Sequence, residues 1–410
     1  MLVDLQIVFI YICVLFEANF IRGQVNNVLT NLTDNNKKCS NQQAEDAVLS
    51  FVELAAKYGH PAQSYEVVTE DGYILTVFRI PGKTKSQPNR TLPILIFHGI
   101  FDSSDTWIIR GNASLAITLA REGRDVWLGN VRGNKYSQGH VYLDPVKDAA
   151  AYWNFTFNEY GIYDLATTID LVLNETGAER LDAYGHSQGN TIFYVLCSSK
   201  PTYNSKINFI AALAPIAYLH HTLPPVSVVI ALSQILTSKA LAFNVYSLFD
   251  VNSTLLKLLR AFCPLPIIGY NVCAFGMLFP INGFDPAEFG PCFLDVTIWH
   301  FPVATSVKNL RHFGQVGLSK RFARYDYGEA GNRKAYNSSL PPVYDLSKVT
   351  TRVILLPGMN DHISTLEDVA ILRRQLPNVV RYRVIPRSKP LALLPVVSKI
   401  FVKIIHNRFL

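Results

Sequence analysis

The chain has 410 residues, of which 49% are hydrophobic, and its 38 Lys and Arg against 31 Asp and Glu give a formal net charge of +7. This length and composition allow one large domain or two, with a sizeable apolar core. The basic residues are dispersed rather than gathered in a run, so we expect no nucleic-acid partner. A solvated basic surface with a mild attraction to anionic lipid is the simpler interpretation.

The first residues resemble a secretory signal peptide. Ten apolar residues run from Ile7 to Phe16, which is too short to span a bilayer. We therefore expect a signal peptide over 1–23 and no transmembrane anchor. Several N-x-S/T glycosylation acceptors agree with a secretory route, and we expect a secreted or lysosomal protein. These acceptors are Asn31, Asn89, Asn112, Asn154, Asn174, Asn252 and Asn337.

The chain then opens with antiparallel strands. A helix is predicted over 44–58, followed by a hairpin with strands at 65–69 and 73–80 around the turn Glu70-Asp71-Gly72. A continuous apolar run over 92–97 predicts a strand buried on both faces. It ends in the loop His98-Gly99-Ile100.

Strands and helices alternate from this point, which predicts a mostly parallel sheet. The elements expected next are a helix over 115–122, a strand over 125–128, a loop over 129–134, a helix over 163–172, a strand over 179–184, a helix over 191–196 and a strand over 207–215.

A serine stands at the junction of one strand and the following helix. The stretch Gly185-His186-Ser187-Gln188-Gly189 has the G-x-S-x-G spacing of a nucleophile elbow, where two glycines make room for a strained turn. We predict Ser187 as the nucleophile. The backbone N–H groups of Gln188 and of Ile100, at the end of the buried strand, are predicted to form the oxyanion hole.

The alternation stops over 216–344, a segment rich in Leu, Phe and Pro, and the sheet resumes with a strand over 352–358. We therefore expect an α/β-hydrolase fold whose core is formed by 24–215 and 345–410, with an inserted, mainly helical cap over 216–344. The apolar content of the cap is explained by packing against the core, by a hydrophobic substrate funnel, or by both.

The six cysteines do not form a disulfide scaffold. Cys263 and Cys273 are close in sequence, and we predict a local bridge between them, with free buried thiols as the alternative. Cys13 leaves with the signal peptide and Cys197 is expected in the core. Cys39 and Cys292 stay unassigned, and we expect no metal and no cofactor.

Asp361 directly follows the resumed strand and is predicted to be the acid that orients a catalytic histidine, in the chain order Ser, Asp, His. The alternative is a structural aspartate in a turn. The base should follow the strand predicted over 379–386, but no histidine occurs over 387–395. We expect none of the nearest alternatives to be the base: His98, which is expected to shape its loop, His186, His362 and His406.

These stretches resemble the acid lipase family, the gastric and lysosomal acid lipases. The resemblance covers nearly all of the mature chain and rests on Tyr58-Gly59-His60-Pro61, Thr69 to Leu75, His98-Gly99, Asp125 to Asn130 with Arg132-Gly133-Asn134, Tyr163-Asp164-Leu165, Gly185 to Gly189 and Asn360-Asp361. It implies an α/β-hydrolase fold with a lipid-admitting cap and hydrolysis of triacylglycerols or sterol esters. It also implies Ser187 and Asp361 as catalytic residues, Ile100 and Gln188 as oxyanion donors, and a bridge between Cys263 and Cys273.

The chain departs from the family pattern at two places. The Asn-His-Leu-Asp-Phe type motif expected near Lys389 and Pro390 is absent, and Asn190 replaces a common threonine. The chain is then either a catalytically impaired, lipid-binding homologue or a lipase whose last segment was lost or misread. We favour the second explanation because Ser187, Asp361 and the oxyanion loop are intact. A peptidase on the same fold is disfavoured by the apolar cap.

Overall fold

The structure is a computed structural model that describes residues 45–82, 91–265, 268–283 and 289–386. Several sequence predictions fall outside these residues: the signal peptide, Cys13 and Cys39, the acceptors Asn31 and Asn89, the positions Lys389 and Pro390, and His406. Among the described helices, none has the length and apolarity needed to cross a membrane.

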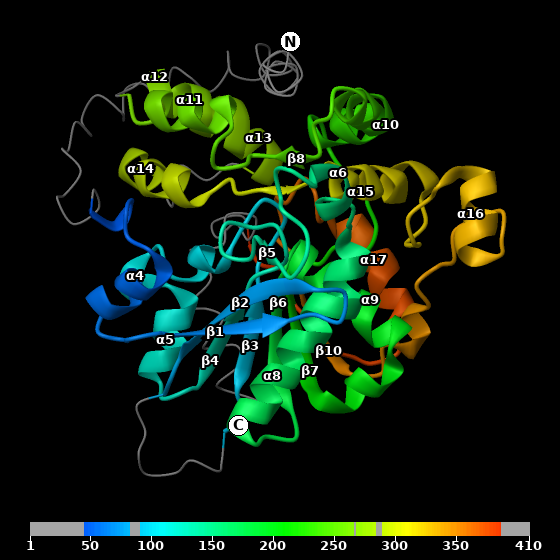
Figure 1. The fold of residues 1–410 in the computed structure, drawn as a ribbon. Helices are drawn as coiled ribbons and strands as arrows, with labels where there is room; N and C mark the ends of the chain where they lie inside the picture. Colours follow the sequence, from blue (N-terminus) through cyan, green and yellow to red (C-terminus); the bar gives the residue numbers. More distant parts are fainter. Residues whose placement is uncertain (1–44, 83–90, 266–267, 284–288, 387–410) are drawn as a thin grey trace.

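A nine-stranded sheet forms the centre of the molecule (Figure 1). Its order is β1-β2-β4-β3-β6-β7-β10-β11, with β5 paired to β2. The strands are β1 (Gln63–Val68), β2 (Tyr73–Ile80), β3 (Ile94–Phe97), β4 (Val126–Gly129), β5 (Gly139–His140), β6 (Leu181–His186), β7 (Ile207–Leu213), β10 (Arg352–Leu356) and β11 (Val379–Tyr382). The pairs from β4 to β11 are parallel, and only the pairs that involve β2 are antiparallel.

The central strands are buried on both faces, as their continuous apolar runs predict. Every residue of β3, β4 and β6 is buried, because helices cover both sides of a parallel sheet. The helices of the core are α4 (Phe51–Lys57), α5 (Leu115–Arg121), α6 (Ala149–Tyr152), α7 (Phe157–Glu159), the π-helix η3 (Tyr160–Leu165), α8 (Ala166–Thr176), α9 (Gln188–Ser199) and α17 (Leu366–Gln375). The 3₁₀ turns are η1 (Ser104–Trp107), η2 (Gly111–Ala113), η4 (Pro201–Lys206) and η6 (Leu346–Lys348).

The first predicted helix is shorter than expected. The prediction placed it over 44–58, whereas α4 begins at Phe51. Ser50 has an extended backbone and accepts the N–H of Glu53, while the Glu53 carboxylate accepts the N–H of Ser50. This capping box fixes the start of the helix, and the apolar pattern upstream does not extend it.

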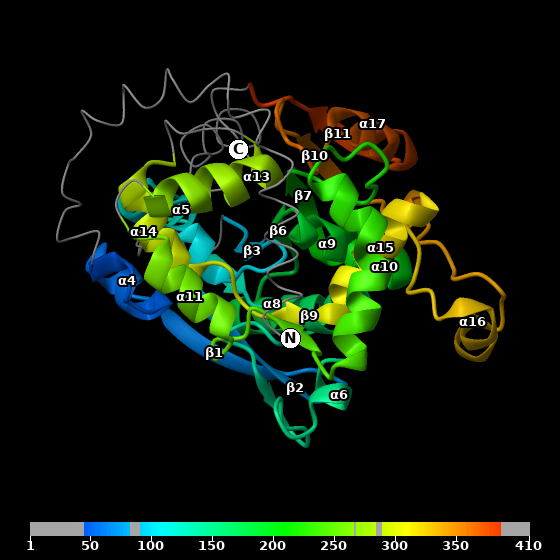
Figure 2. The same cartoon turned by 90° about the horizontal axis from the view of Figure 1, so that it is seen from above.

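The segment between β7 and β10 is mainly helical and lies over one edge of the sheet (Figures 1 and 2). We call residues 216–344 the cap. Its elements are α10 (Val226–Ala242), α11 (Thr254–Phe262), α12 (Ile268–Tyr270), the π-helix η5 (Asn271–Leu278), α13 (Phe279–Asn282), α14 (Pro291–His300), α15 (Val307–Ser319) and α16 (Gly328–Tyr336), with the two-stranded sheet β8 (Ser247–Leu248) and β9 (Thr305–Ser306). Cys263 and Cys273 form a disulfide bond in the cap, and Cys197 is a buried free thiol in α9.

Candidate active site

Ser187 occupies a strained turn between β6 and α9. Its φ is +50° and its ψ is −117°, a conformation that a residue with a side chain seldom adopts. Both flanking residues must be glycine, because a side chain at either position would clash with neighbouring atoms. A Cβ on Gly185 would lie 2.6 Å from Oδ1 of Asn190, and a Cβ on Gly189 would lie 2.6 Å from the carbonyl oxygen of Phe97. The geometry is that of a nucleophile elbow.

The loop that follows β3 packs against this turn. A Cβ on Gly99 would lie 2.9 Å from Nδ1 of His186 and 3.5 Å from Cβ of Ser187. The next residue, Ile100, lines the same cavity as Ser187. Gln188 is the first residue of α9, so its N–H has no acceptor within the helix.

The side chain of His98 forms hydrogen bonds with this loop and with the loop after β4. Its Nδ1 donates to the carbonyl oxygen of Gly99 at 2.8 Å, and its Nε2 accepts the N–H of Val131 at 3.3 Å. Burial lowers the pKa of His98 to about 4, so the ring is neutral near pH 7. Because both nitrogens are engaged, His98 shapes the loop, as the sequence predicted.

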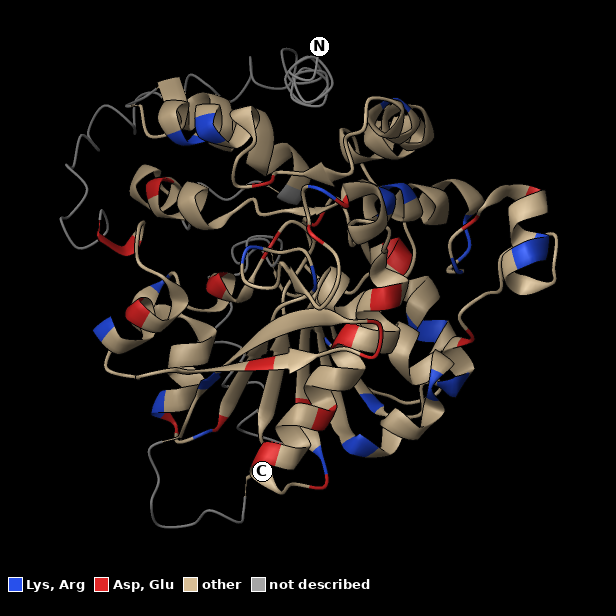
Figure 3. Ribbon diagram, viewed as in Figure 1, with Lys and Arg blue, Asp and Glu red and all other residues tan. Residues whose placement is uncertain are grey.

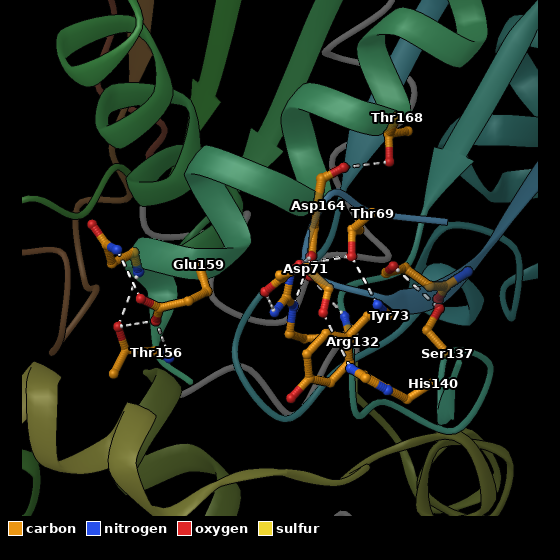
Figure 4. A network of polar contacts seen from close by, with 12 residues as sticks. Thr69, Asp71, Tyr73, Arg132, Ser137, His140, Thr156, Glu159, Asp164 and Thr168 are labelled. Carbon is orange, nitrogen blue, oxygen red and sulfur yellow. Dashed lines mark hydrogen bonds and ion pairs between the residues drawn. The ribbon is translucent and has the colours of Figure 1, made fainter. Parts of the chain in front are cut away.

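A buried ionic network supports the same region (Figure 4). The Arg132 side chain is only 1% exposed. Its Nε donates to Asp164 at 2.8 Å and its Nη2 donates to Asp71 at 2.8 Å. The guanidinium also lies 3.9 Å from the centre of the Tyr73 ring. The network joins three stretches that carry the family resemblance: the β1–β2 turn, the loop after β4 and the π-helix η3.

Asp361 follows β10, which lies two strands from β6 in the sheet. It is buried, and its Oδ1 accepts the backbone N–H groups of Ile363 at 2.9 Å and Ser364 at 2.8 Å. Its Oδ2 is also buried but has no hydrogen-bond partner among the described residues. Burial raises the pKa of Asp361 above its usual value.

None of the nine described histidines forms a hydrogen bond with Asp361, since the bonds of this carboxylate come from backbone N–H groups. His362 turns away toward the cap, where its Nδ1 contacts the carbonyl oxygen of Pro280 at 2.8 Å. The described residues therefore hold no base on Asp361. The nine are His60, His98, His140, His186, His220, His221, His300, His312 and His362.

A cavity of about 270 Å³ lies between Ser187 and the cap. Most of its wall is apolar, and it includes side chains from α10, α11 and α14. Two polar residues that sequence reasoning missed also line it. Asp102 is buried, and its burial raises the pKa to about 8. His300 donates from the cap to Asp105 of the core at 2.7 Å, a pairing across 195 positions that has no local sequence signal.

Comparison with known proteins agrees with this architecture. Residues 51–111 match the partial α/β-hydrolase lipase region, and residues 93–253 match the α/β hydrolase fold. The chain is 36% identical to Lipase 1 of Drosophila melanogaster over 346 residues, covering 84% of this chain and 75% of that protein. It is 35% identical to human gastric triacylglycerol lipase over 348 residues, covering 83% and 85%.

Human lipase member K is also similar, at 33% identity over 361 residues and with 85% of this chain and 87% of that protein covered. Relatives of this identity and coverage confirm the family and the fold predicted from the sequence. The chain belongs to the α/β-hydrolase lipase family that includes gastric triacylglycerol lipase.

Proposed function

We propose that this chain is a serine lipase that hydrolyses triacylglycerols, with Ser187 as the nucleophile. The observation that carries the proposal is the strained Ser187 elbow opening into an apolar cavity beneath the cap. A mainly apolar wall suits acyl chains, and the serine stands at one side of the space where an ester carbonyl would bind. The name of the gastric triacylglycerol lipases, at 35% identity, points to the same substrate class.

In the proposed reaction, Ser187 Oγ attacks the ester carbonyl carbon while a base accepts its proton. The carbonyl oxygen becomes negatively charged and accepts hydrogen bonds from the backbone N–H groups of Ile100 and Gln188. The alcohol leaves with a proton, and water then hydrolyses the acyl-serine. Asp361 orients the base and stabilises it once protonated.

The position of Asp361 supports this role. Its Oδ1 is held by two backbone N–H groups, and the buried Oδ2 is left to accept an imidazole N–H. The backbone of Ile385 pairs with Pro357 and Met359, at 2.8 and 2.9 Å. The described chain therefore ends at Pro386 close to the Asp361 loop, and we propose that Oδ2 accepts the N–H of the catalytic base.

Labelling by a fluorophosphonate probe, together with fatty-acid release from emulsified triolein and from a cholesteryl ester, tests the proposal. We expect labelling and triolein hydrolysis by the wild type and neither by Ser187→Ala. If Ser187 is labelled but only the cholesteryl ester is hydrolysed, the substrates are sterol esters and not triacylglycerols. Absence of both activities would refute the lipase proposal.

Imidazole added to the assay distinguishes the alternative of a catalytically impaired homologue, which the comparisons do not favour. Free imidazole can occupy a vacant base position beside Asp361, so it should accelerate only an enzyme that lacks its own base. We expect less than a twofold effect on the wild-type chain. A rate that is near zero and rises tenfold or more with imidazole would identify a scaffold without a base.

We further propose that the cap docks on a lipid–water interface through exposed apolar side chains on and next to α10, α11 and α12. These are Ile235, Phe243, Leu258, Phe262, Leu265 and Ile268. Lys257 and Arg260 also lie on α11, where Figure 3 shows basic residues, and they would attract anionic lipid. Leu258→Glu should weaken emulsion binding but spare hydrolysis of a soluble ester. Val146→Glu, on the core, is the matched control.

Secretion or delivery to the lysosome is the proposed destination. Five predicted glycosylation acceptors fall within the described residues, and all five are exposed: Asn112, Asn154, Asn174, Asn252 and Asn337. The Cys263–Cys273 disulfide is also typical of an oxidising compartment. Treatment of the protein from a eukaryotic host with N-glycosidase should lower its apparent mass, and an unchanged mass would contradict this destination.

A further inference from the structure

Two histidines and an aspartate meet outside the cavity that Ser187 lines. His220 and His221 lie in the segment that leads from β7 into α10, and Asp368 lies in the first turn of α17. One ligand atom from each of the three residues lies within 4.8 Å of the other two. The aspartate is 147 positions from His221, so only the fold brings the three together.

The partners of these side chains favour a ligand. Asp368 is 2% exposed, and its two carboxylate oxygens face Nδ1 of His221 at 2.8 Å and the N–H of His221 at 3.0 Å. The Nε2 atom of His220 is buried and has no hydrogen-bond partner among the described residues. This nitrogen is therefore available to bind a metal.

We propose that His220, His221 and Asp368 form a binding site for Zn²⁺ or a similar divalent transition metal. Two imidazole nitrogens and one carboxylate form a ligand set typical of zinc, whereas Ca²⁺ and Mg²⁺ take oxygen ligands. Zinc at about 2.0–2.1 Å from each ligand requires ligand atoms roughly 3.3 Å apart. The cluster must therefore contract, and the His221 side chain, which is 50% exposed, has room to turn.

Charge and solvent access set the remaining features of the site. The carboxylate of Asp368 supplies negative charge, and the ammonium of Lys320 opposes a cation near His220. Because His221 is half-exposed, water can fill the fourth coordination position. The metal would replace the hydrogen bond between His221 Nδ1 and Asp368, with the imidazole proton moving to Nε2.

The site would attach the start of the cap to α17, the helix that directly follows the loop with Asp361. The N–H of Leu223 already donates to the carbonyl oxygen of His362 at 2.9 Å, and Oγ of Ser364 donates to the carbonyl oxygen of Pro215 at 2.8 Å. A metal bound by His220, His221 and Asp368 would add to these connections and to the bond that the N–H of His221 already donates to Asp368. Its role is structural, and it does not depend on the proposed lipase activity.

Metal binding to the full, untagged chain after EDTA treatment tests the site. We expect one Zn²⁺ per chain by calorimetry, visible absorption from four-coordinate Co²⁺, and a higher melting temperature with Zn²⁺. His221→Ala and Asp368→Asn should weaken Zn²⁺ binding by at least tenfold and remove the thermal shift.

Glu367→Gln is the matched control, because it removes the same charge one residue earlier on an exposed position of α17. It should bind Zn²⁺ within twofold of the wild type. His221→Ala alters a half-exposed side chain, so it remains informative if Asp368→Asn does not fold. No binding by the wild type, or equal binding by wild type and His221→Ala, would overturn the proposal.

Discussion

Adding a single methyl group at Gly99 should disturb the proposed oxyanion hole without removing a catalytic group. The new Cβ would lie 2.9 Å from Nδ1 of His186, about 0.5 Å inside the 3.4 Å at which ordinary contact begins. His186 is buried and is the last residue of β6, next to Ser187. Because the interior is close-packed, His186 has no room to move away, and the Gly99 loop must move instead. The adjacent N–H of Ile100 moves with it.

A shift of about 0.5 Å matters because the N–H donors of an oxyanion hole must lie within about 3.1 Å of the developing oxyanion. Loss of a whole donor costs about 10²–10³ in kcat, and a 1 Å misplacement costs up to about 10². For Gly99→Ala we therefore expect kcat to fall about 10- to 100-fold, equivalent to about 1.4–2.7 kcal/mol. KM should change less than about threefold, because the acyl chain is bound by the cavity wall.

Hydrolysis of p-nitrophenyl butyrate and urea unfolding give the required measurements. Gly290→Ala is the matched control, since a Cβ there meets no atom within 4 Å and φ is −77°. It should keep kcat and the urea midpoint of the wild type. If Gly99→Ala stays folded and its kcat equals that of Gly290→Ala, the Ile100 amide does not serve the reaction.

Three other changes probe separate parts of the structure. Asp361→Asn should lower kcat by about 10⁴ with the fold intact, measured against Ser187→Ala as the floor, because the amide cannot stabilise a protonated base. Asp164→Asn should lower the free energy of unfolding in urea by about 3–5 kcal/mol, since Arg132 stays buried with one carboxylate fewer; an effect below 1 kcal/mol would contradict this. Burial raises the pKa of Asp102 to about 8, so the folded chain holds a proton that the unfolded chain releases near pH 4. The resulting stability is complete below pH 4 and is lost as the pH rises toward 8. The wild type should therefore lose more stability between pH 5 and 8 than Asp102→Asn, and equal losses would refute the assignment.

Local patterns predicted the strands and the elbow because the sheet itself imposes them. The apolar runs around β3 and β6 are continuous since both faces are covered, and Gly185 and Gly189 stand where a Cβ would meet backbone or Asn190. These signals lie within a few residues of each other. The error at α4 came from extending an apolar pattern upstream of Ser50. The side-chain hydrogen bonds of this N-terminal capping residue start the helix there and override the pattern.

Contacts between distant segments could not be predicted in the same way. His300 meets Asp105 across 195 positions, and His221 meets Asp368 across 147. Each residue alone is an ordinary polar side chain in an apolar context. The pairing depends on how the cap closes on the core, which no periodicity or spacing encodes.

The stretches that carry the family resemblance mostly support the site instead of performing chemistry. Asp71, Arg132 and Asp164 lock three loops together, and the loop after β4 holds His98, which in turn holds Gly99. Similarity in these stretches therefore reports the scaffold. It would persist in an active lipase and in an impaired one alike, so the resemblance by itself does not decide between them.

Asp361 bears on that question independently of the scaffold. A buried carboxylate oxygen without a partner costs about 1–3 kcal/mol or more, and Oδ2 of Asp361 is in this state within the described residues. The backbone bonds to Oδ1 hold the side chain in place without satisfying Oδ2. An imidazole N–H bound at Oδ2 would remove this penalty. The orphaned oxygen thus favours a lipase with a base on Asp361 over a scaffold that never had one.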